Sequence, residues 1–409
     1  MKPIEEARAE VLAEVKPLAS ERVSIWDASG RVLAVGVAAP ENVPPFDNSA
    51  MDGFAVRGDD VSQPGSVLEV IDDLPAGSSP SIEVGEGQAS RIMTGAPIPP
   101  GADTVVKVED TNSSDGTVNI AVAVEPGTAI RSAGGDVVEG QAVFTAGTRL
   151  TPMHVGVLAT LGISNPEVFK KPRVAYMSTG DELAPVDGGA LEPGMIRDSN
   201  RPMLKAMLDD AGVELIDVGV IPDDEDVLRN ALDEASEADV IITTGGVSMG
   251  DYDVTKLVLS RDSGVQFWKI AMQPAKPFAF GHVGDALFFG LPGNPVSVLV
   301  SYEQFARPAL MKMQGSKAMF RPRMAAIADE DLVTDPAKTV FVRVWITGEV
   351  GGGIHVAKSG GQASNILSAA AAADAFAIVP RGTETVAAGG DVTIELFKSP
   401  ETMETNDGR

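Results

Sequence analysis

The chain lacks cysteine altogether, and only three of its 409 residues are histidines. Without thiols it forms no disulfide and offers no thiolate ligand to a metal ion. His154, His282 and His355 lie too far apart in the sequence to match a zinc-binding spacing. Any bound metal is therefore expected to be a hard cation held by oxygen ligands.

Basic residues are scarce, and long apolar runs are missing. The chain has 32 lysines and arginines against 58 acidic residues, which gives a formal net charge of -26. Nucleic acids and anionic membranes bind basic surfaces, so neither partner is expected. No apolar run is long enough to span a bilayer, and residues 1–15 are charged where a signal peptide would be apolar. We therefore expect a cytoplasmic globular protein, in which an anionic ligand would need a locally basic pocket.

The chain is too long for one hydrophobic core, and its patterning changes several times. It opens with an amphipathic helix and a predicted hairpin over residues 23–37, and reaches a proline-rich linker at residues 40–45. Short β segments follow, strand–helix alternation begins at Pro172, and short β segments return after residue 321. The expected domains are a linking domain (1–45 and 140–170, including the first helix), a small β domain (46–139), an α/β domain (171–318) and a C-terminal β-barrel-like domain (319–409).

The pattern of apolar residues in the third of these domains predicts the fold class. Apolar strands are expected at residues 174–177, 213–218 and 240–242, and helices at residues 200–211, 226–238 and 296–313. Strands that alternate with helices are typical of a doubly wound, mainly parallel sheet. The chain is therefore predicted to be a multidomain α/β protein, with two small β domains and a mixed linking domain. Ligands of such sheets bind beyond the carboxyl ends of the strands.

Three acidic residues, Glu182, Asp223 and Asp253, lie just past predicted strand ends. Their common position is better explained by a binding site than by chance, although either Asp223 or its neighbour Asp224 could face that site. Gly245 and Gly246 follow the central strand and would let backbone N–H groups approach an anion. Taken alone, this glycine turn favours a simpler interpretation, a tight strand-to-helix turn with Asp253 as the helix N-cap.

Polar loops of the first half of the chain are open to the same two interpretations. Ser49 and Asp52 lie in a turn-prone stretch, Thr94 precedes a glycine, and Arg131 and Asp136 flank Gly134–Gly135. Each loop is explained by a structural turn, in which Asp or Ser side chains bond to the backbone. Each would equally present a hydroxyl, guanidinium or carboxylate group to a ligand.

Several motifs in order resemble those of the molybdopterin molybdenumtransferases, the bacterial counterparts of the gephyrin E domain. The resemblance covers nearly the whole chain, and NSAMDG together with RIMTGAP is highly specific. The motifs are NSAMDGFAVR (48–57), RIMTGAPIPPGAD (91–103), IRSAGGDV (130–137), STGDEL (178–183), IRDSN (196–200), TTGGVSMGDYDVTK (243–256), QPAKPFAFG (273–281) and LPGNPVS (291–297).

The resemblance implies an activity and its participants. Molybdate and adenylylated molybdopterin would be the substrates, and Mg²⁺ would assist hydrolysis of the phosphoanhydride, with release of AMP and molybdenum cofactor. The resemblance implies a set of catalytic acids: Asp52, Asp136, Glu182, Asp223 and Asp253, of which Glu182, Asp223 and Asp253 would bind the metal. It also implies a set of substrate-binding residues: Ser49, Thr94, Arg131, Gly245, Gly246, Ser248, Lys256, Lys269, Lys276, Pro292, Pro295 and Ser364.

One departure from the family pattern concerns charge. Many relatives have lysine where this chain has Gln273, in a Lys-Pro-Gly-Lys run that is Gln273-Pro274-Ala275-Lys276 here. The loss of one positive charge would weaken oxyanion binding or move its position.

The resemblance also implies partners and leaves two other functions open. It implies a homodimer, joined through the linking domain, whose active site lies between protomers, together with a molybdopterin adenylyltransferase and apo-molybdoenzymes as possible partners. The chain could instead be a molybdopterin adenylyltransferase, which uses a related α/β domain but needs no NSAMDG domain. It could also be a catalytically retired scaffold, as gephyrin's clustering role illustrates. The whole-length match argues against the first alternative, and the intact acids argue against the second.

Overall fold

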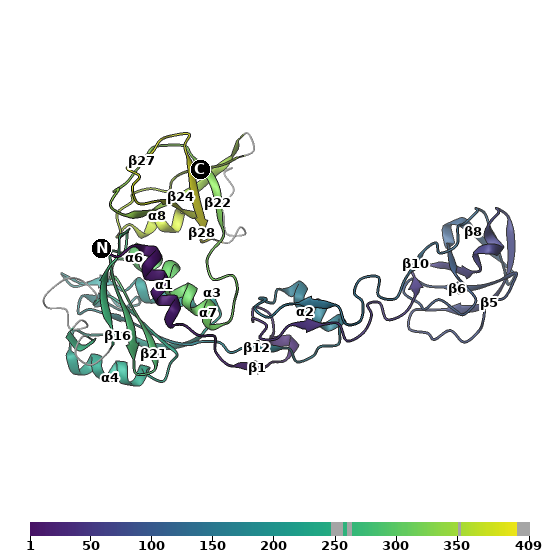
Figure 1. Ribbon diagram of the computed structural model, residues 1–409, viewed down its shortest axis with the longest axis horizontal. Helices are drawn as coiled ribbons and strands as arrows, with labels where there is room; N and C mark the ends of the chain where they lie inside the picture. The colour runs from purple at the N-terminus through teal and green to yellow at the C-terminus, as the bar shows by residue number, and fades with distance from the viewer. Residues whose placement is uncertain (247–256, 260–263, 351–352, 399–409) are drawn as a thin grey trace.

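The computed structural model describes residues 1–246, 257–259, 264–350 and 353–398. The molecule is elongated (Figure 1). At one end the α/β domain carries the C-terminal β domain beside it, and at the other end lies the small β domain. A slender linking domain, marked by helix α2 (Pro152–Thr160), joins the two ends. The multidomain α/β architecture predicted from the sequence is confirmed.

A six-stranded sheet forms the centre of the α/β domain, in the order β16-β13-β17-β21-β20-β18. Neighbours β16, β13, β17 and β21 are parallel, whereas β20 and β18 add two antiparallel pairings at one edge. The strands span Arg173–Thr179 (β13), Glu214–Ile221 (β16), Val240–Thr244 (β17), Gln266–Lys269 (β18), Pro277–Val283 (β20) and Ala286–Leu291 (β21). Strands β13, β17 and β21 are buried almost throughout, because helices cover both faces of the sheet.

Each face of this sheet has its own apolar core. One face packs against α1 (Ile4–Glu14), α3 (Asn200–Ala211), α6 (Pro295–Ser301) and α7 (Arg307–Met313), and the other packs against α4 (Glu225–Ala235). The sequence grouped the first helix with the linking domain. In the structure Ile4, Ala7 and Val11 instead complete the α/β core, because they are the apolar stripe of that helix.

The predicted helix over residues 296–313 is present but not uniform. Its central turn, Tyr302–Ala306, has π-helical hydrogen bonding and separates α6 from α7. All five residues of this turn are buried, including Glu303 and Gln304. The Glu303 carboxylate is bound by Arg321 through Nε at 3.0 Å and Nη2 at 3.1 Å. The long helix therefore carries a buried ion pair that no hydrophobic pattern would predict.

The linking domain is built from short antiparallel pairs and α2. Strand β1 (Ser20–Arg22) pairs with β12 (Glu167–Phe169), and β2 (Val37–Ala38) pairs with β11 (Ala142–Phe144). The hairpin predicted over residues 23–37 is wrong, because this stretch forms a 3-10 turn (Ile25–Asp27) and its flanking residues pair with segments distant in the sequence. Thr151 caps α2 as predicted, and His154 takes part in that cap and packs against Phe144.

The small β domain contains a second six-stranded sheet, in the order β7-β4-β6-β5-β9-β8. The sequence predicted short β segments in this part of the chain, and short strands are found there. Apolar clusters lie on both faces of the sheet. The strands span Gly53–Val56 (β4), Ser66–Leu74 (β5), Gln88–Ile92 (β6), Thr104–Lys107 (β7), Thr111–Ser114 (β8) and Thr117–Ile120 (β9). Beside this sheet, β3 (Asn48–Ser49) pairs with β10 (Ile130–Arg131).

The C-terminal sheet closes on itself, because β24 pairs with both β25 and β26. Its strands span Arg323–Ala328 (β22), Thr339–Val350 (β24), Gly353–Lys358 (β25), Ala375–Val379 (β26) and Asp391–Leu396 (β28). Strand β19 (Met272–Gln273), from the α/β segment of the chain, pairs in parallel with the start of β24. Helix α8 (Leu367–Ala372) packs against α6, so strand pairing and helix packing both tie this domain to the α/β domain.

The remaining short pairs are β14 (Leu183–Ala184) with β15 (Ile196–Arg197) and β23 (Leu332–Val333) with β27 (Thr385–Val386). Across the described ranges, no helix combines the length and apolarity needed to cross a bilayer.

Candidate functional site

The carboxyl edge of the α/β sheet gathers polar residues in a definite order. Strands β16, β13, β17 and β21 run in one direction, and β18 shares that direction because it is antiparallel to β20, which is antiparallel to β21. Acidic residues follow β16 and β13, and glycines follow β17. At the far side, Lys269 ends β18 and Lys276 immediately precedes β20. The edge therefore changes from negative to positive across the glycine turn.

The negative part of this edge contains three carboxylates. Glu182 follows β13 and Asp223 follows the neighbouring strand β16, as the sequence predicted. The backbone N–H of Asp223 donates to Oδ1 of Asp181 at 3.1 Å, which adds a third acid that sequence reasoning did not select. Burial, and then the negative charges of Asp181 and Glu182, raise the pKa of Asp223. A divalent cation would relieve this crowding, and carboxylate oxygens are the kind of ligand that such a cation prefers.

The structure distinguishes Asp223 from Asp224. The Asp224 carboxylate accepts hydrogen bonds from the backbone N–H groups of Asp226 (2.9 Å) and Val227 (3.0 Å), and so caps α4. This engagement leaves Asp223 as the carboxylate available to a ligand. Among the residues that the structure describes, no three His, Asp or Glu side chains form a metal-binding group. Asp253, the third ligand expected from the sequence, lies outside those residues, as do Ser248 and Lys256.

At the glycine turn in the centre of the edge, the ends of β13, β17 and β21 lie close together. Gly245 has φ +93°, and a Cβ at this position would lie 2.6 Å from the backbone oxygen of Thr179. Its N–H donates to the carbonyl of Leu291 at 3.0 Å. The position therefore requires glycine for backbone reasons, while leaving the ends of β13, β17 and β21 close together. Gly246, also with positive φ, continues the turn.

The positive part of the edge opens into a pocket of about 410 Å³ between the α/β and C-terminal domains. Three residues expected from the sequence, Lys276, Pro292 and Ser364, line it together, whereas Pro295 starts α6 and Lys269 ends β18 outside its lining. The other polar residues of the lining are Gln273, Asn294, Ser297, Lys338 and Gln362.

Lys338 is the residue of this pocket that sequence reasoning missed. It lies in the loop before β24, where no motif or periodicity singles it out. The pairing of β19 with β24 brings its ammonium group to 3.4 Å from Oε1 of Gln273 and 2.6 Å from Oδ2 of Asp335. An ammonium group from another domain, paired with Asp335, thus lies next to Gln273.

A second group of the expected residues lies on the small β domain. Oδ1 of Asp52 accepts hydrogen bonds from the backbone N–H of Thr94 at 2.7 Å and from its hydroxyl at 2.9 Å. These two bonds hold the pKa of the exposed Asp52 carboxyl below its usual value. The pairing of β3 with β10 places Ser49 opposite Ile130, next to Arg131.

Asp136 follows in the same polar loop, which is fastened to the linker before β3. The N–H of Asp136 donates to the carbonyl of Val43 at 2.9 Å, and the N–H of Ala133 donates to Oδ1 of Asp47 at 2.7 Å. The Ser49 hydroxyl is already used locally, donating to the carbonyl of Met51 at 2.5 Å. These bonds give the loop the role of a structural turn, which was one of the two interpretations of its sequence. The Arg131 side chain remains exposed.

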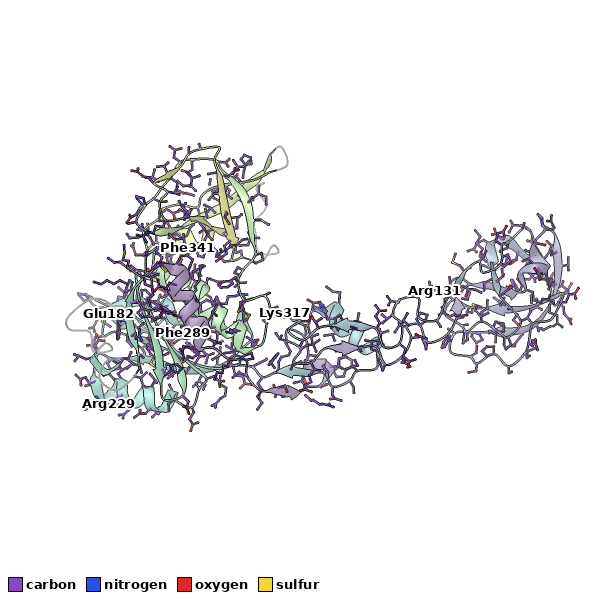
Figure 2. All side chains as sticks on the ribbon, in the orientation of Figure 1. Arg131, Glu182, Arg229, Phe289, Lys317 and Phe341 are labelled. Carbon is purple, nitrogen blue, oxygen red and sulfur yellow. The ribbon has the colours of Figure 1, made fainter. Side chains whose placement is uncertain are left out.

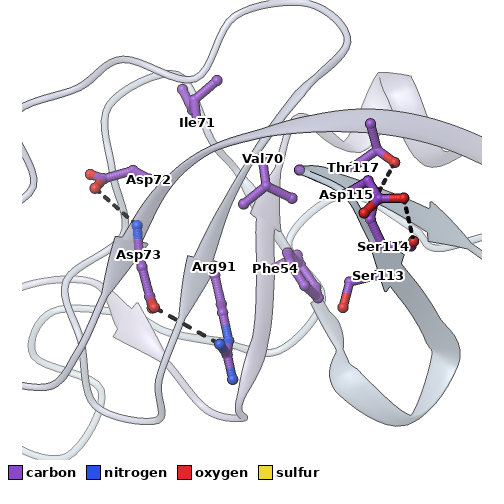
Figure 3. A pocket seen from close by; sticks show the side chains of 11 residues that line it. Phe54, Val70, Ile71, Asp72, Asp73, Arg91, Ser113, Ser114, Asp115 and Thr117 are labelled. Carbon is purple, nitrogen blue, oxygen red and sulfur yellow. Dashed lines mark hydrogen bonds and ion pairs between the residues drawn. The ribbon is translucent and has the colours of Figure 1, made fainter.

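A larger pocket, of about 510 Å³, lies on the same domain beneath the β8–β9 turn (Figure 3). Its acidic groups are engaged with their neighbours: Asp73 with Arg91 at 3.9 Å, Asp72 with the N–H of Asp73 at 2.9 Å, and Asp115 with Ser114 at 3.2 Å. None of the catalytic or substrate-binding residues expected from the sequence lines it. We therefore do not assign the candidate site to this pocket.

Comparisons with known proteins agree over the whole chain. Residues 2–162 match the MoeA N-terminal region (domain I and II), residues 175–312 a probable molybdopterin binding domain, and residues 325–397 the MoeA C-terminal region (domain IV). A molybdopterin molybdenumtransferase of Haemophilus influenzae is 40% identical over 401 residues, covering 97% of this chain and 99% of that protein. The chain belongs to the molybdopterin molybdenumtransferase family.

Further relatives support this membership. A molybdopterin molybdenumtransferase 2 of Mycobacterium tuberculosis is 38% identical over 94% of this chain and 96% of its own length. A crystal structure of the molybdopterin biosynthesis MoeA protein of Pyrococcus horikoshii aligns with a TM-score of 0.83 and 30% identity, over 97% of this chain and all of that one. The family resemblance inferred from the motifs is confirmed.

Within one chain of this molybdenumtransferase family member, the two groups of candidate residues are separated. Figure 2 shows Arg131 on the small β domain and Glu182 on the α/β domain, at opposite ends of the molecule, with the linking domain between them. Asp52 and Thr94 belong to the first group, and Asp223 and Lys276 belong to the second. One chain therefore does not bring the two groups together.

Proposed function

We propose that this chain inserts molybdate into adenylylated molybdopterin and hydrolyses the phosphoanhydride, releasing AMP and molybdenum cofactor. Molybdenum transfer to molybdopterin is the activity named for its curated relatives. The observation that carries the proposal is the order of charge along the sheet edge. Along this edge, carboxylates suited to a cation come first and a glycine turn that a ligand can approach comes next. A pocket with two ammonium groups follows. Such an edge matches a ligand that joins a pyrophosphate to an oxyanion.

The acidic part of the edge would hold Mg²⁺ through Glu182, Asp223 and Asp253. When bound, this ion neutralises phosphoanhydride charge and favours its hydrolysis. The crowding that raises the pKa of Asp223 supports the assignment, because a site that repels its own negative charges is suited to a cation. The glycine turn would lie against the nucleotide or pterin, where a side chain at Gly245 would collide with the backbone.

The basic pocket would receive molybdate. Lys276 and Lys338 supply two ammonium groups, and Ser297, Asn294 and Ser364 supply neutral polar groups to the same lining. Charge-assisted hydrogen bonds from such groups are the usual means of holding an oxyanion. Because Lys338 comes from the C-terminal domain, the molybdate site would exist only while that domain stays docked.

The residues of the small β domain would complete the site from a second copy of the chain. Their separation from Glu182 within one chain supports a homodimer with the active site between protomers. Asp52, with its pKa held low by Thr94, stays ionised at neutral pH. An acid of this kind is a weak proton acceptor, so it would orient the attacking water, while Arg131 would bind a phosphate oxygen.

The test of the proposed function is an in vitro transfer assay. Purified protein, adenylylated molybdopterin and Mg²⁺ are mixed with or without molybdate, and AMP release is followed together with activation of an apo-molybdoenzyme. Molybdate-dependent AMP release is expected. Release of pyrophosphate from ATP with free molybdopterin would instead indicate an adenylyltransferase, and the absence of any turnover would indicate a scaffold.

Replacing Lys276 by methionine should raise the KM for molybdate by about tenfold or more, with a smaller change in kcat. The pocket would lose one of its two ammonium groups, and a charge-assisted hydrogen bond contributes about 1.5–3 kcal/mol. Steady-state AMP release against molybdate concentration measures both constants. Lys205→Met is the matched control, because that exposed lysine pairs with Asp209 on α3, away from the pocket. An unchanged KM in Lys276→Met would show that this pocket does not bind molybdate.

A further inference from the structure

A network of buried polar side chains joins the α/β domain to the C-terminal domain. Gln304, in the π-helical turn between α6 and α7, has no exposed surface. Its Oε1 accepts from Nη2 of Arg8 on α1, and its Nε2 donates to Oε1 of Glu395 on β28 at 2.5 Å. The other carboxylate oxygen of Glu395 accepts from Nε of Arg323 on β22 at 2.8 Å. One amide therefore bridges a guanidinium of one domain and a carboxylate of the other.

The charged members of this network are withdrawn from water at the boundary between the domains. Glu395 is only 2% exposed. Burial, and then the charge of Arg323, lower the pKa of Arg8 to about 10, so this guanidinium stays charged at neutral pH. Polar groups in such surroundings are costly unless their hydrogen bonds are made. Because the bonds of Gln304 reach into both domains, they are all made only in one relative orientation of the two.

Apolar contacts at the same boundary specify that orientation less strictly. Phe341, Ala370 and Phe376 of the C-terminal domain belong to the same apolar cluster as the helices of the α/β domain. The hydrophobic effect is non-directional, so these contacts would tolerate several orientations. Hydrogen bonds depend on distance and angle, and a polar network that crosses the boundary therefore selects among them.

Other directional bonds across the boundary lie beside the basic pocket. They are the pairing of β19 with β24 and the bond at 3.1 Å from the N–H of Val296 to the carbonyl of Ser364. The network of Gln304 lies elsewhere, because it reaches β22 and β28, whose residues do not line the pocket. Figure 1 shows α1 and α6 on the side of the α/β domain that lies next to β28 and α8. The network thus attaches the C-terminal domain at a second region, which limits rotation about the first.

The orientation of this domain matters because it carries part of the pocket. Lys276 belongs to the α/β domain, whereas Lys338 belongs to the loop before β24 and follows any movement of the C-terminal domain. Charge-assisted hydrogen bonds weaken steeply when donor and acceptor move apart. A small rotation of the domain would therefore remove one of the two ammonium groups from a bound anion.

We propose that Gln304 is a positioning residue, whose amide fixes the orientation of the C-terminal domain and thereby places the Lys338 ammonium in the basic pocket. The inference rests on the proposed function only for the identity of the anion, molybdate. A glutamine that merely filled the core would contribute stability without setting the orientation of a domain, and this difference can be measured.

The decisive variant exchanges the two bonded side chains, as Gln304→Glu with Glu395→Gln. Gln304→Glu alone places two buried carboxylates against each other, and Glu395→Gln alone removes the carboxylate that faces Arg323. In the exchanged protein the carboxylate at position 304 can accept from Arg8. The amide at position 395 can donate to that carboxylate and accept from Arg323. Gln304→Met is a further variant, which removes both bonds at similar volume without adding charge.

Domain orientation is measured as the distance between two spin labels. Because the chain has no cysteine, Glu234→Cys on α4 and Arg381→Cys on the C-terminal domain, both at exposed positions, provide unique attachment sites. The labelled chain is diluted with unlabelled chain, so that distances within one chain dominate. Calorimetry measures the Kd for molybdate, and thermal melting measures stability. Gln63→Glu and Glu384→Gln make the same chemical changes at exposed positions and are the matched controls.

The single variants at positions 304 and 395 are expected to shift or broaden the distribution of label distances and to raise the Kd for molybdate about tenfold, the scale of one charge-assisted hydrogen bond. The exchanged protein should recover the wild-type distance and a Kd within about threefold of wild type. The controls should change neither quantity.

Two results would overturn the inference: a wild-type distance in Gln304→Glu, or an exchanged protein that stays as altered as the single variants. If Gln304→Glu fails to fold, Gln304→Met replaces it, and a wild-type distance in that variant counts equally against the inference. Distances that behave as expected in a protein that binds no molybdate would uphold the role of Gln304 in domain orientation and refute the proposed function alone, because the label measurement requires neither ligand nor turnover.

Discussion

Replacing Asp52 by asparagine is expected to lower molybdate-dependent AMP release by about a hundredfold or more while leaving the fold intact. In the native protein this carboxylate is exposed and is held ionised by two hydrogen bonds from Thr94, and in the proposed function it orients the attacking water. Loss of one correctly placed charged group in an active site typically costs this much in rate. Single-turnover AMP release measures the effect, and thermal melting checks the fold.

The matched control is Asp73→Asn, an exposed acid on the same domain that pairs weakly with Arg91. It should leave AMP release within about twofold of wild type, since exposed pairs of this kind contribute little. Thr94→Val should fall between the two, because it removes the hydroxyl but keeps the N–H donor to Asp52. Full activity in Asp52→Asn would exclude the small β domain from the reaction.

Mixed dimers extend this prediction to the site between protomers. Asp52→Asn and Glu182→Gln chains, each expected to be nearly inactive alone, would be refolded or co-expressed together. If each site combines the small β domain of one copy with the α/β domain of the other, a mixed dimer has one intact site and one doubly altered site. Random pairing would then restore about a quarter of wild-type activity. If both residues acted within one chain, every site would carry one defect and no activity would return.

The largest effect on stability is expected from Arg321→Met. Glu303 lies in the π-helical turn with 3% of its surface exposed and is held by Arg321 through two hydrogen bonds. Without that partner the core keeps a buried carboxylate, whose remaining ion pair within the described part of the chain is with Arg307 at 3.8 Å. Removing one member of a buried pair costs about 3–5 kcal/mol, and denaturant titration measures the loss. The control, Arg229→Met, alters the exposed pair with Asp226 on α4 and should cost under about 1 kcal/mol.

The loss in Arg321→Met should depend on pH. Burial raises the pKa of Glu303, and the bond and charge of Arg321 oppose that rise. In the variant the folded pKa therefore moves further above the unfolded value. A carboxyl with a raised folded pKa binds protons more tightly in the native state, so unfolding free energy falls as pH rises through that window. The destabilisation should be larger at pH 8 than at pH 5, and a constant loss would mean that Glu303 keeps its charge state.

The double variant Arg321→Met Glu303→Gln tests whether the loss of stability comes from the uncompensated charge or from the packing of the Arg321 side chain. Removing both charges leaves no uncompensated carboxylate, and replacements of buried pairs by neutral residues are often close to neutral in stability. The double variant should therefore recover most of the loss seen in Arg321→Met. Failure to recover would indicate that packing of the Arg321 side chain, rather than charge compensation, holds the long helix.

The sequence predicted well where a pattern is local. Alternation of strands and helices after Pro172 was enough for the parallel sheet, because its apolar strands and amphipathic helices each carry their own periodicity. The Thr151–Pro152 start of α2 and the Gly212 end of α3, where φ is +72°, were visible in the same way. The stretch over residues 23–37 failed because its partners lie more than a hundred residues away along the chain.

The residues of the candidate site also divide into those that a local pattern predicts and those that it does not. Glu182, Asp223 and Gly245 could be placed at one sheet edge from the sequence, since the carboxyl ends of parallel strands share an edge. Lys276 was expected only from the family resemblance. Lys338 could not be placed, because it reaches the site through a strand pairing between domains that no spacing encodes. Asp181 was overlooked although it lies next to Glu182 at the same strand end. Asp224 was indistinguishable from Asp223 until its carboxylate was seen to cap α4.

By itself, then, the sequence determined the fold class, the family and the acid-bearing edge of the sheet, because periodicity, absent cysteine and ordered motifs are properties of the chain alone. Only the tertiary structure decided three further matters. It showed that the first helix completes the α/β core, that a lysine of the C-terminal domain stands beside Gln273, and that the two groups of candidate residues lie at opposite ends of one chain. These depend on which surfaces bury one another, a property of packing between elements distant in sequence rather than of any local pattern.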